Sequence, residues 1–293
     1  MKTMKKAYED YLQRRNILMQ DSHAQFWFEQ EKRYVHPFRI FGNIYYVGDN
    51  WVCVHIIDTG DGLLMIDAGN VGATAMLINS IWEIGLDPKN VKWIILSHGH
   101  VDHIGAAWFF KRMFGTRLLM GEPDAINFKE KPELSAIQDA GQLQDSLFMV
   151  DEVIRDGDVK QFGNTLIHFF LVPGHTDGCV AAFFDVSDGV SFKRAGYYGG
   201  FGFNTLQKDY LLEIGDNTFN HRKMYLNSLR HVREQKVDIF LGNHTENNHL
   251  LEKRKQMLMG CSKNPFINSS EWKEYLDKKR DALMLFMNDP KNK

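Results

Sequence analysis

The sequence predicts a single α/β domain, and three observations carry this prediction. Apolar segments with the pattern of β-strands alternate with segments of helical spacing from residue 38 onward. No low-complexity linker divides the chain. A chain of 293 residues that is 44% hydrophobic can bury one large core without disulfides.

The first 35 residues are expected to form a helical extension ahead of the main domain, which we place at residues 36–293. Tyr8 and Leu12 stand at helical spacing in this extension. A strongly aromatic patch at residues 26–28 follows them. The aromatic patch predicts that the extension docks on the main domain.

The first half of the main domain reads as strands followed by a helix. Residues 39–48 and 51–69 have the texture of β-strands, and the TGDG segment in the second range predicts a hairpin. Residues 71–85 return to helical spacing. Residues 91–100 form a continuous apolar run that ends in a polar loop, as in a buried strand.

The second half continues the alternation of helices and strands. Residues 104–115 predict a helix that ends at its last glycine. Two strands are expected around a turn at Gly163-Asn164, followed by a second polar loop. Residues 217–234 suit a helix, and residues 237–244 a last buried strand that ends in a third polar loop. A C-terminal helix is predicted by the apolar stripe Trp272, Tyr275, Leu276, Leu283, Phe286 and Met287.

Composition narrows the possible partners and location. The formal net charge is −2 and no long basic run occurs, which argues against nucleic-acid and membrane partners. The cysteines lie far apart without paired spacing, as expected of reduced thiols. The charged N-terminus lacks the apolar stretch of a signal peptide. We therefore expect a cytoplasmic protein with a small-molecule substrate; the sequence favours no particular oligomeric state.

Three polar loops, each after an apolar strand, carry the candidate metal ligands. In the first loop, His98 and His100 project to the same side and can hold one ion. Asp102 and the histidine after it lie around the bend and can reach a second ion. The complete set of candidate ligands is His98, His100, Asp102, His103, His175 and His244.

This ligand set predicts catalysis at a pair of metal ions. Six nitrogen and oxygen ligands leave three for each ion, so that a position stays open for water. Two such cations can share a hydroxide and polarise a carbonyl group, with Asp102 orienting the hydroxide. Imidazoles with a single carboxylate favour Zn²⁺, with iron or manganese as alternatives.

At these residues the chain resembles the metallo-β-lactamase superfamily, and within it the third subclass of metallo-β-lactamases. The similarity extends over about residues 36–290 and rests on SHGHVDH, RIFGNIYYVG, LLMIDAG, the RDGD turn, PGHTDG and the NPFIN…W…YL tail. The resemblance implies a four-layered αββα sandwich of two mixed β-sheets. It also implies that one zinc ion binds His98, His100 and His175 and the other binds Asp102, His103 and His244.

One departure from the family pattern bears on the substrate. Lactonases, hydroxyacylglutathione hydrolases and nucleases of this fold bridge the two ions with an aspartate that follows the PGH motif. The corresponding window here, residues 194–200, reads RAGYYGG and contains no acid. β-Lactamases carry a serine or cysteine near this place, where this chain has glycines. The pattern favours a lactamase-like site and argues against antibiotics as the natural substrate.

Other residues are candidates for supporting roles. Asp67 could accept a proton from a metal-bound imidazole, or simply form a strand-end turn. Thr176 could likewise support the second loop or form part of its turn. Tyr197, Tyr198 or Asn204 could donate a hydrogen bond to a developing oxyanion. Nearby Phe201 or Phe203 would then form an apolar wall, and the alternative for these aromatic side chains is core packing.

The remaining histidines are not expected to bind metal. His55 could face the site from its strand, but a locally hydrogen-bonded side chain is the more usual outcome. His249 lacks the strand-end position that favours His244. Surface positions are expected for His168, His221 and His231.

The sequence thus predicts a zinc-dependent hydrolase whose metal-bridging hydroxide attacks the carbonyl of a small cyclic amide, lactone or ester. Three alternatives remain open. A phosphodiesterase or nuclease is disfavoured by the absent bridging acid and basic run. A di-iron redox protein of this fold typically has a glutamate where His100 stands. The last alternative is a non-catalytic metal-binding protein.

Overall fold

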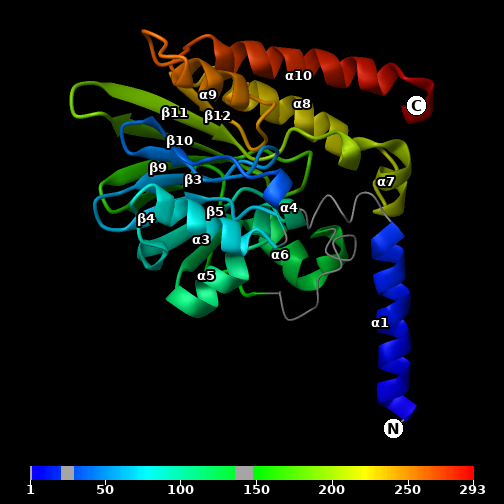
Figure 1. Cartoon of the computed structure of the whole chain (residues 1–293). Coiled ribbons are helices and arrows are strands. Elements are labelled where there is room, and N and C mark those ends of the chain that lie inside the picture. Colours follow the sequence, from blue (N-terminus) through cyan, green and yellow to red (C-terminus); the bar gives the residue numbers. More distant parts are fainter. Residues whose placement is uncertain (1, 21–29, 71, 136–147) are drawn as a thin grey trace.

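Two β-sheets lie face to face, with helices on the outer side of each (Figure 1). The computed structural model describes residues 2–20, 30–70, 72–135 and 148–293. Seven strands form one sheet and five form the other. The expected four-layered αββα sandwich is confirmed.

The seven-stranded sheet follows the chain order from its first strand to its last. Its strands are β1 (Phe38–Phe41), β2 (Ile44–Tyr46), β3 (His55–Asp58), β4 (Leu63–Ile66), β5 (Val91–Leu96), β6 (Arg117–Gly121) and β7 (Glu152–Ile154). The pairs from β1 to β4 are antiparallel and the pairs from β4 to β7 are parallel. The sheet is therefore mixed.

The five-stranded sheet has the order β12-β11-β10-β9-β8. Its strands are β8 (Val159–Phe162), β9 (Thr165–Leu171), β10 (Val180–Ser187), β11 (Phe192–Tyr198) and β12 (Ile239–Leu241). Only β11 and β12 pair in parallel. As a result β9, β11 and β12 run in the same direction and end at the same edge of the sheet.

Both predicted hairpins are confirmed. Between β3 and β4, the amide of Thr59 donates to the carbonyl of Gly62 at 3.0 Å. Gly62 has a φ of 114°, a conformation that a side chain would strain. Between β8 and β9 the turn contains Gly163, with a φ of 50°.

Alternating side chains of the strands build the separate layers of the core. In β4, Leu64 packs into the cluster between the sheets, whereas Met65 packs under the helices outside. In β10, Phe184 lies between the sheets and Phe183 lies under the helices of the opposite side. Because successive side chains of a strand point to opposite faces, each sheet buries both of its faces.

Helices cover the outer faces. The helices near the first sheet are α3 (Thr74–Glu83), α4 (Val101–Ile104), α5 (Ala107–Phe114) and α6 (Glu122–Glu130). Those near the second sheet are α7 (Lys208–Glu213), α8 (Asn220–Val232), α9 (Leu250–Leu258) and α10 (Glu271–Asn288). Leu77 and Phe110 anchor α3 and α5 to the first sheet. Leu229 and Trp272 anchor α8 and α10 to the second.

The helix predicted over residues 104–115 is observed as α5, which begins at Ala107 and ends as predicted; the short α4 lies almost entirely before it. Gly115 follows α5 with a φ of 70°, the left-handed conformation that commonly ends helices.

The N-terminal extension contains the helix α1 (Lys2–Gln20), which extends away from both sheets (Figure 1). Met4, Tyr8 and Tyr11 on this helix are exposed. The docking expected of this extension is therefore not observed for α1. The aromatic patch at residues 26–28 lies outside the described residues. Among the helices that are described, none has the length and apolar character to cross a membrane.

Candidate metal centre

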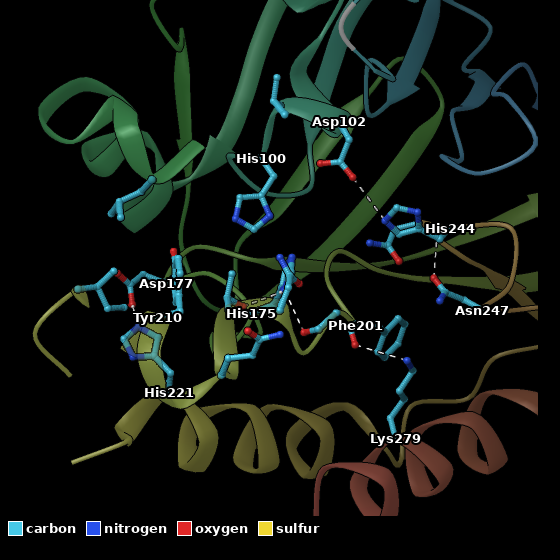
Figure 2. A pocket seen from close by; sticks show the side chains of 18 of the residues that line it. His100, Asp102, His175, Asp177, Phe201, Tyr210, His221, His244, Asn247 and Lys279 are labelled. Carbon is cyan, nitrogen blue, oxygen red and sulfur yellow. Dashed lines mark hydrogen bonds and ion pairs between the residues drawn. The ribbon is translucent and has the colours of Figure 1, made fainter. Parts of the chain in front are cut away.

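The predicted ligand loops meet at one edge of the sandwich, beside a cleft of about 1150 Å³ (Figure 2). The first loop follows β5 of the seven-stranded sheet, and the other two follow β9 and β12 of the five-stranded sheet. Ligands from both sheets therefore converge where the strands end. His100, His175 and His244 all line the cleft.

His98, His100 and His175 form the first group of candidate ligands. One ring nitrogen of each lies within 4.8 Å of the others. The closest pair is Nε2 of His98 and Nδ1 of His100, which are 3.1 Å apart. All three side chains are buried.

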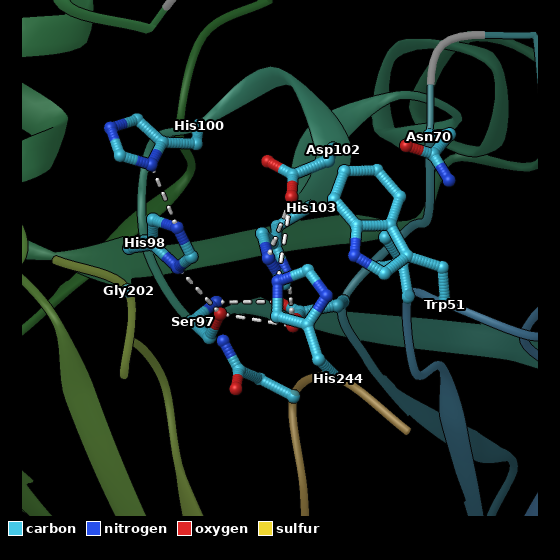
Figure 3. A network of polar contacts seen from close by, with 12 residues as sticks. Trp51, Asn70, Ser97, His98, His100, Asp102, His103, Gly202 and His244 are labelled. Atoms are coloured by element: carbon cyan, nitrogen blue, oxygen red, sulfur yellow. Dashed lines mark hydrogen bonds and ion pairs between the residues drawn. The ribbon is translucent and has the colours of Figure 1, made fainter. Parts of the chain in front are cut away.

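Asp102, His103 and His244 lie on the other side of His98 (Figure 3). Oδ2 of Asp102 is 3.3 Å from Nε2 of His103 and 3.6 Å from Nε2 of His244. His98 also lies within 4.8 Å of Asp102 and His103 by their ligand atoms. The two groups are thus neighbours, as a binuclear centre requires.

Electrostatics keeps most of these imidazoles neutral. Burial lowers the pKa of His100 to about 4. Burial, with the nearby charge of His103, lowers the pKa of His244 to about 4 as well. The pKa values of His98 and His175 also lie well below the usual range, again chiefly because of burial. A neutral imidazole offers the lone pair that metal binding needs.

Asp102 and His103 behave oppositely, because each stabilises the charge of the other. Burial raises the pKa of Asp102, but His103, His244 and His100 together hold it well below its usual range. Burial lowers the pKa of His103, but Asp102 and Asp67 together raise it to about 10. The anionic carboxylate is the form that binds a cation.

The residues present fit a pair of zinc ions. Nε2 of His103 and Nδ1 of His244 are buried and make no hydrogen bond to any described residue. Nε2 of His103 lies near Asp102 without adequate hydrogen-bond geometry. Buried polar atoms without partners are rare in proteins unless an ion or water completes them. Five imidazoles and one carboxylate are a donor set that zinc prefers.

Asp67, predicted to support a ligand, is in direct contact with His103. Its Oδ2 accepts from Nδ1 of His103 at 2.8 Å and from the hydroxyl of Tyr197 at 2.5 Å. Its Oδ1 accepts from the amide of Ser97 at 2.7 Å. Asp67 also has a φ of 63°, so the backbone turns sharply where β4 ends. Because Nδ1 of His103 donates to this carboxylate, Nε2 is left directed toward Asp102 and the candidate metal centre.

Tyr197 and Tyr198, considered as oxyanion donors, do not line the cleft; the alternative of core packing holds for both. Tyr197 is buried between the sheets and its hydroxyl is bonded to Asp67. Tyr198 points to the opposite face of β11, where its ring stacks on Phe201 at 4.3 Å. Both side chains belong to a strand that is buried on its two faces, so neither reaches the cleft.

Asn204 and Phe201 line the cleft as expected. Phe203 does not; its ring packs against Tyr225 and Phe286. Of the three residues predicted to stabilise an oxyanion, only Asn204 is therefore placed where a substrate can reach it.

Asp124 is a residue that the sequence did not reveal. It lies in the first turn of α6, is 3% exposed, and accepts hydrogen bonds from Gly99 at 2.9 Å and from Gly178 at 2.6 Å. Thr176 donates to the same carboxylate at 2.7 Å. Asp124 therefore ties the first ligand loop to the second, and Thr176 supports the site through it. No motif surrounds this aspartate, so only the structure could find it.

His221, predicted at the surface, lines the cleft instead. Its Nδ1 lies 2.7 Å from Oδ2 of Asp216, and its Nε2 lies 3.0 Å from Oδ1 of Asp177. The side chain belongs to the first turn of α8, which faces the second ligand loop. The surface prediction was wrong because the spacing of residues within a helix gives no information about which distant loop packs against the start of that helix.

The other histidines lie away from the metal ligands. His55 is buried and its Nε2 is 3.0 Å from the carbonyl of Gly242, so it is hydrogen-bonded locally as expected. His249 and His231 are exposed and His168 is partly exposed.

Trp51 is a further residue that the sequence did not single out. It lines the cleft, and its ring lies 5.0 Å from that of His244. The carbonyl of Trp51 accepts from the amide of Thr245, which anchors the third ligand loop to the chain before β3.

Two glycines explain why no additional acid stands between the ligand loops. A Cβ at Gly200 would lie 2.6 Å from Cδ2 of His175. A Cβ at Gly199 would lie 2.8 Å from the carbonyl oxygen of Ser97. Any side chain at these positions would displace the ligand loops themselves.

Comparison with known proteins agrees with this geometry. Residues 51–192 match the family model described as the metallo-beta-lactamase superfamily. The subclass B3 metallo-beta-lactamase BJP-1 of Bradyrhizobium japonicum is 26% identical, with a TM-score of 0.76 over 88% of this chain and 96% of that one. FEZ-1 from Legionella gormanii is 25% identical, with a TM-score of 0.78 over 87% of this chain and 96% of that one.

Among curated proteins, the hydroxyacylglutathione hydrolase GloC of Haemophilus influenzae is 32% identical over 128 residues. This alignment covers 43% of the present chain and 57% of that hydrolase. The matching region includes the strands that carry the first two ligand loops, and the fold agrees over most of the molecule. The chain is therefore similar to the metallo-beta-lactamase superfamily over residues 51–192 and shares the fold of its subclass B3 members over most of its length.

Proposed function

We propose that this protein is a zinc-dependent hydrolase that breaks the C–N or C–O single bond at the carbonyl carbon of a small cyclic amide, lactone or ester. The observation that carries the proposal is the gathering of the six candidate ligands beside an open cleft, which His100, Asp102, His175 and His244 line directly. Zinc bound there would supply a water of lowered pKa and would polarise the carbonyl group.

Two side chains of the cleft are suited to assist the reaction. Asp102 is 13% exposed toward the cleft, and its anionic carboxylate can orient a water molecule. The amide of Asn204 can donate a hydrogen bond to the oxygen that gains negative charge. Trp51 and Phe201 supply apolar surface that excludes water from bound substrate.

The glycines at the end of β11 favour cyclic amides over lactones. Gly199 and Gly200 leave no room for an acidic side chain between the ligand loops. The residues therefore support a site without a bridging carboxylate, like that of a lactamase rather than that of a lactonase. Thioester hydrolysis is a second candidate, because a hydroxyacylglutathione hydrolase is among the relatives.

A hydrolysis panel on metal-analysed protein tests the proposal. The panel contains a cephalosporin, a lactone, a thioester and an activated phosphodiester, each assayed with and without a chelator. We expect two zinc ions per chain and chelator-sensitive cleavage of a carbonyl substrate, with none of the phosphodiester. Cleavage of the phosphodiester alone, or activity that survives metal removal, would contradict the proposal.

Elemental analysis separates the remaining alternatives. A coloured protein that contains iron and cleaves nothing in the panel would point to redox chemistry. Two bound zinc ions without any turnover would point to a metal-binding protein that does not catalyse.

A further inference from the structure

The C-terminal helix α10 contributes a lysine to the cleft (Figure 2). Nζ of Lys279 lies 3.4 Å from the carbonyl oxygen of Phe201, to which it donates. The same ammonium lies 5.8 Å from the ring centre of Phe201, 5.4 Å from that of Phe203 and 5.5 Å from that of Tyr275. Three aromatic rings and one carbonyl therefore hold this cation at the cleft wall.

The ammonium has no carboxylate partner among the described residues. Glu246 lines the same cleft, but it acts on Lys279 only from a distance and forms no ion pair with it. Burial lowers the pKa of Lys279, and Glu246 offsets only part of this effect. A lysine has three N–H donors, and the structure accounts for one of them.

Lys253 is a second lysine that lies against an aromatic ring, and its contacts indicate a purely structural role. Its Nζ lies 5.3 Å from the ring centre of Phe266, and it also contacts both carboxylate oxygens of Glu271, at 2.5 and 2.6 Å. Both lysines are partly desolvated and both lie against aromatic rings. The difference is that Lys279 faces an open cleft and forms no ion pair with any carboxylate of the described residues.

We propose that Lys279 binds a carboxylate of the substrate, so that the hydrolase acts on anionic small molecules. This inference rests on the proposed function for its chemistry, but the binding itself depends only on the lysine and its surroundings. The carboxylate would complete the donors of the ammonium in a partly desolvated setting, where a charge-assisted hydrogen bond is strong.

The backbone links this anchor to the metal centre. The carbonyl of Phe201 accepts from Lys279, and the next carbonyl, that of Gly202, lies 3.0 Å from Nδ1 of His175. Adjacent peptide groups thus position the anion anchor and a candidate metal ligand. A second link runs through Asn247, whose side chain accepts from the amide of His244 and donates to Tyr275. Both links fix where a substrate carboxylate lies relative to the reacting carbonyl.

Binding of phenylacetate and of neutral phenylacetamide, measured by calorimetry, tests the anchor directly. The test compares the zinc-loaded wild-type chain with Lys279→Met, which keeps the apolar stem but removes the charge. Lys278→Met, at an exposed neighbouring position of α10, is the matched control. Because phenylacetate can also bind zinc, each protein is measured again after metal removal.

We expect phenylacetate to bind the wild-type chain and Lys278→Met roughly 10-fold more tightly than Lys279→Met, with and without zinc. Phenylacetamide should bind all three equally. Equal phenylacetate affinity in wild type and Lys279→Met, or no binding to the metal-free wild-type chain, overturns the inference.

A kinetic comparison uses phenyl acetate and its 4-carboxylated analogue. In Lys279→Met the KM of the carboxylated ester should rise roughly 10-fold, with kcat and the neutral ester unchanged. A parallel loss for both esters would show that the lysine supports the fold and not the anion. If the wild-type chain cleaves neither ester, the proposed function fails, and the binding measurement still decides the role of Lys279.

Discussion

At the scale of single residues, the histidines of the first ligand loop are the most consequential side chains of the molecule. His98 lies between the two candidate ligand groups, and His100 completes the first group at the cleft wall. Each side chain is buried and kept neutral by its surroundings. Without the imidazole of His98 or of His100, only two candidate ligands of the first group would remain for its ion.

We expect His100→Ala to lower zinc binding and turnover by roughly 100-fold or more, because removing a ligand costs more than removing the residue that supports it. The fold should remain, since His100 lies at the cleft and not in the hydrophobic clusters. Bound zinc, turnover and thermal melting are measured together. His249→Ala, at an exposed position, is the control and should leave all three unchanged.

Asp67 allows a subtler test, because it contacts His103 rather than the cleft. Asn tolerates the left-handed backbone that Asp67 adopts, so Asp67→Asn should fold. The amide cannot match the carboxylate as an acceptor for His103 and Tyr197, and zinc affinity should fall about 10–100-fold. Competition with a chromophoric chelator measures the affinity. An unchanged value would mean that Asp67 serves only the turn after β4.

At the scale of elements, Asp124 shows how one helix start organises two loops. It links the backbone at Gly99 to that at Gly178, and so connects the loop after β5 to the loop after β9. Burial raises the pKa of Asp124 to about 6, although its hydrogen bonds favour the charged form. The native state therefore binds a proton more tightly here than the unfolded chain does.

This shift predicts a pH dependence of stability. The unfolded aspartate has a pKa near 3.9, so between about pH 4 and pH 6 only the native state keeps its proton, and stability falls as the pH rises. Asp124→Asn does not titrate. Its free energy of unfolding relative to wild type should therefore rise by up to about 3 kcal/mol between pH 4 and pH 7.

Denaturant unfolding at both pH values measures this difference. Asp209→Asn, at an exposed position, is the control and should run parallel to wild type. A difference for Asp124→Asn that stays constant with pH would show that Asp124 remains charged throughout.

The sequence predicted those elements whose patterns are local. The hairpin turn before β4, the end of α5 at Gly115 and the strands that precede the ligand loops depend on neighbouring residues only. His221 was placed wrongly and Tyr197 was left between two alternatives, because their surroundings come from distant segments. Asp124 and Lys279 were missed for the same reason, since neither sits in a motif.

At the scale of the whole molecule, the candidate metal centre joins the two sheets. Its first four ligands follow β5 in the seven-stranded sheet, and the last two follow strands of the other sheet. Ions bound there would hold the two halves of the sandwich together. The cytoplasmic location and the preference for small-molecule substrates stay predictions at this scale.

We expect zinc to raise the melting temperature, since a ligand that binds only the native state stabilises it by about 2.7 kcal/mol at 100 times its dissociation constant. Calorimetry with stepwise added zinc measures the effect, and a chelator should reverse it. His175→Ala removes a ligand from the second sheet and should abolish most of the gain, whereas His249→Ala should retain it. A melting temperature indifferent to zinc would show that the native state binds the ions weakly or not at all.

The glycines that end β11 also limit how this enzyme can change. Because a Cβ at position 200 would lie 2.6 Å from Cδ2 of His175, a carboxylate side chain there requires the second ligand loop to shift. An evolutionary path toward lactonase chemistry must first move the second loop, and variants on that path would hold their metals poorly. The substrate range of this lineage is therefore expected to diversify through the far walls of the cleft, where α7 and α10 supply side chains that can be exchanged one at a time.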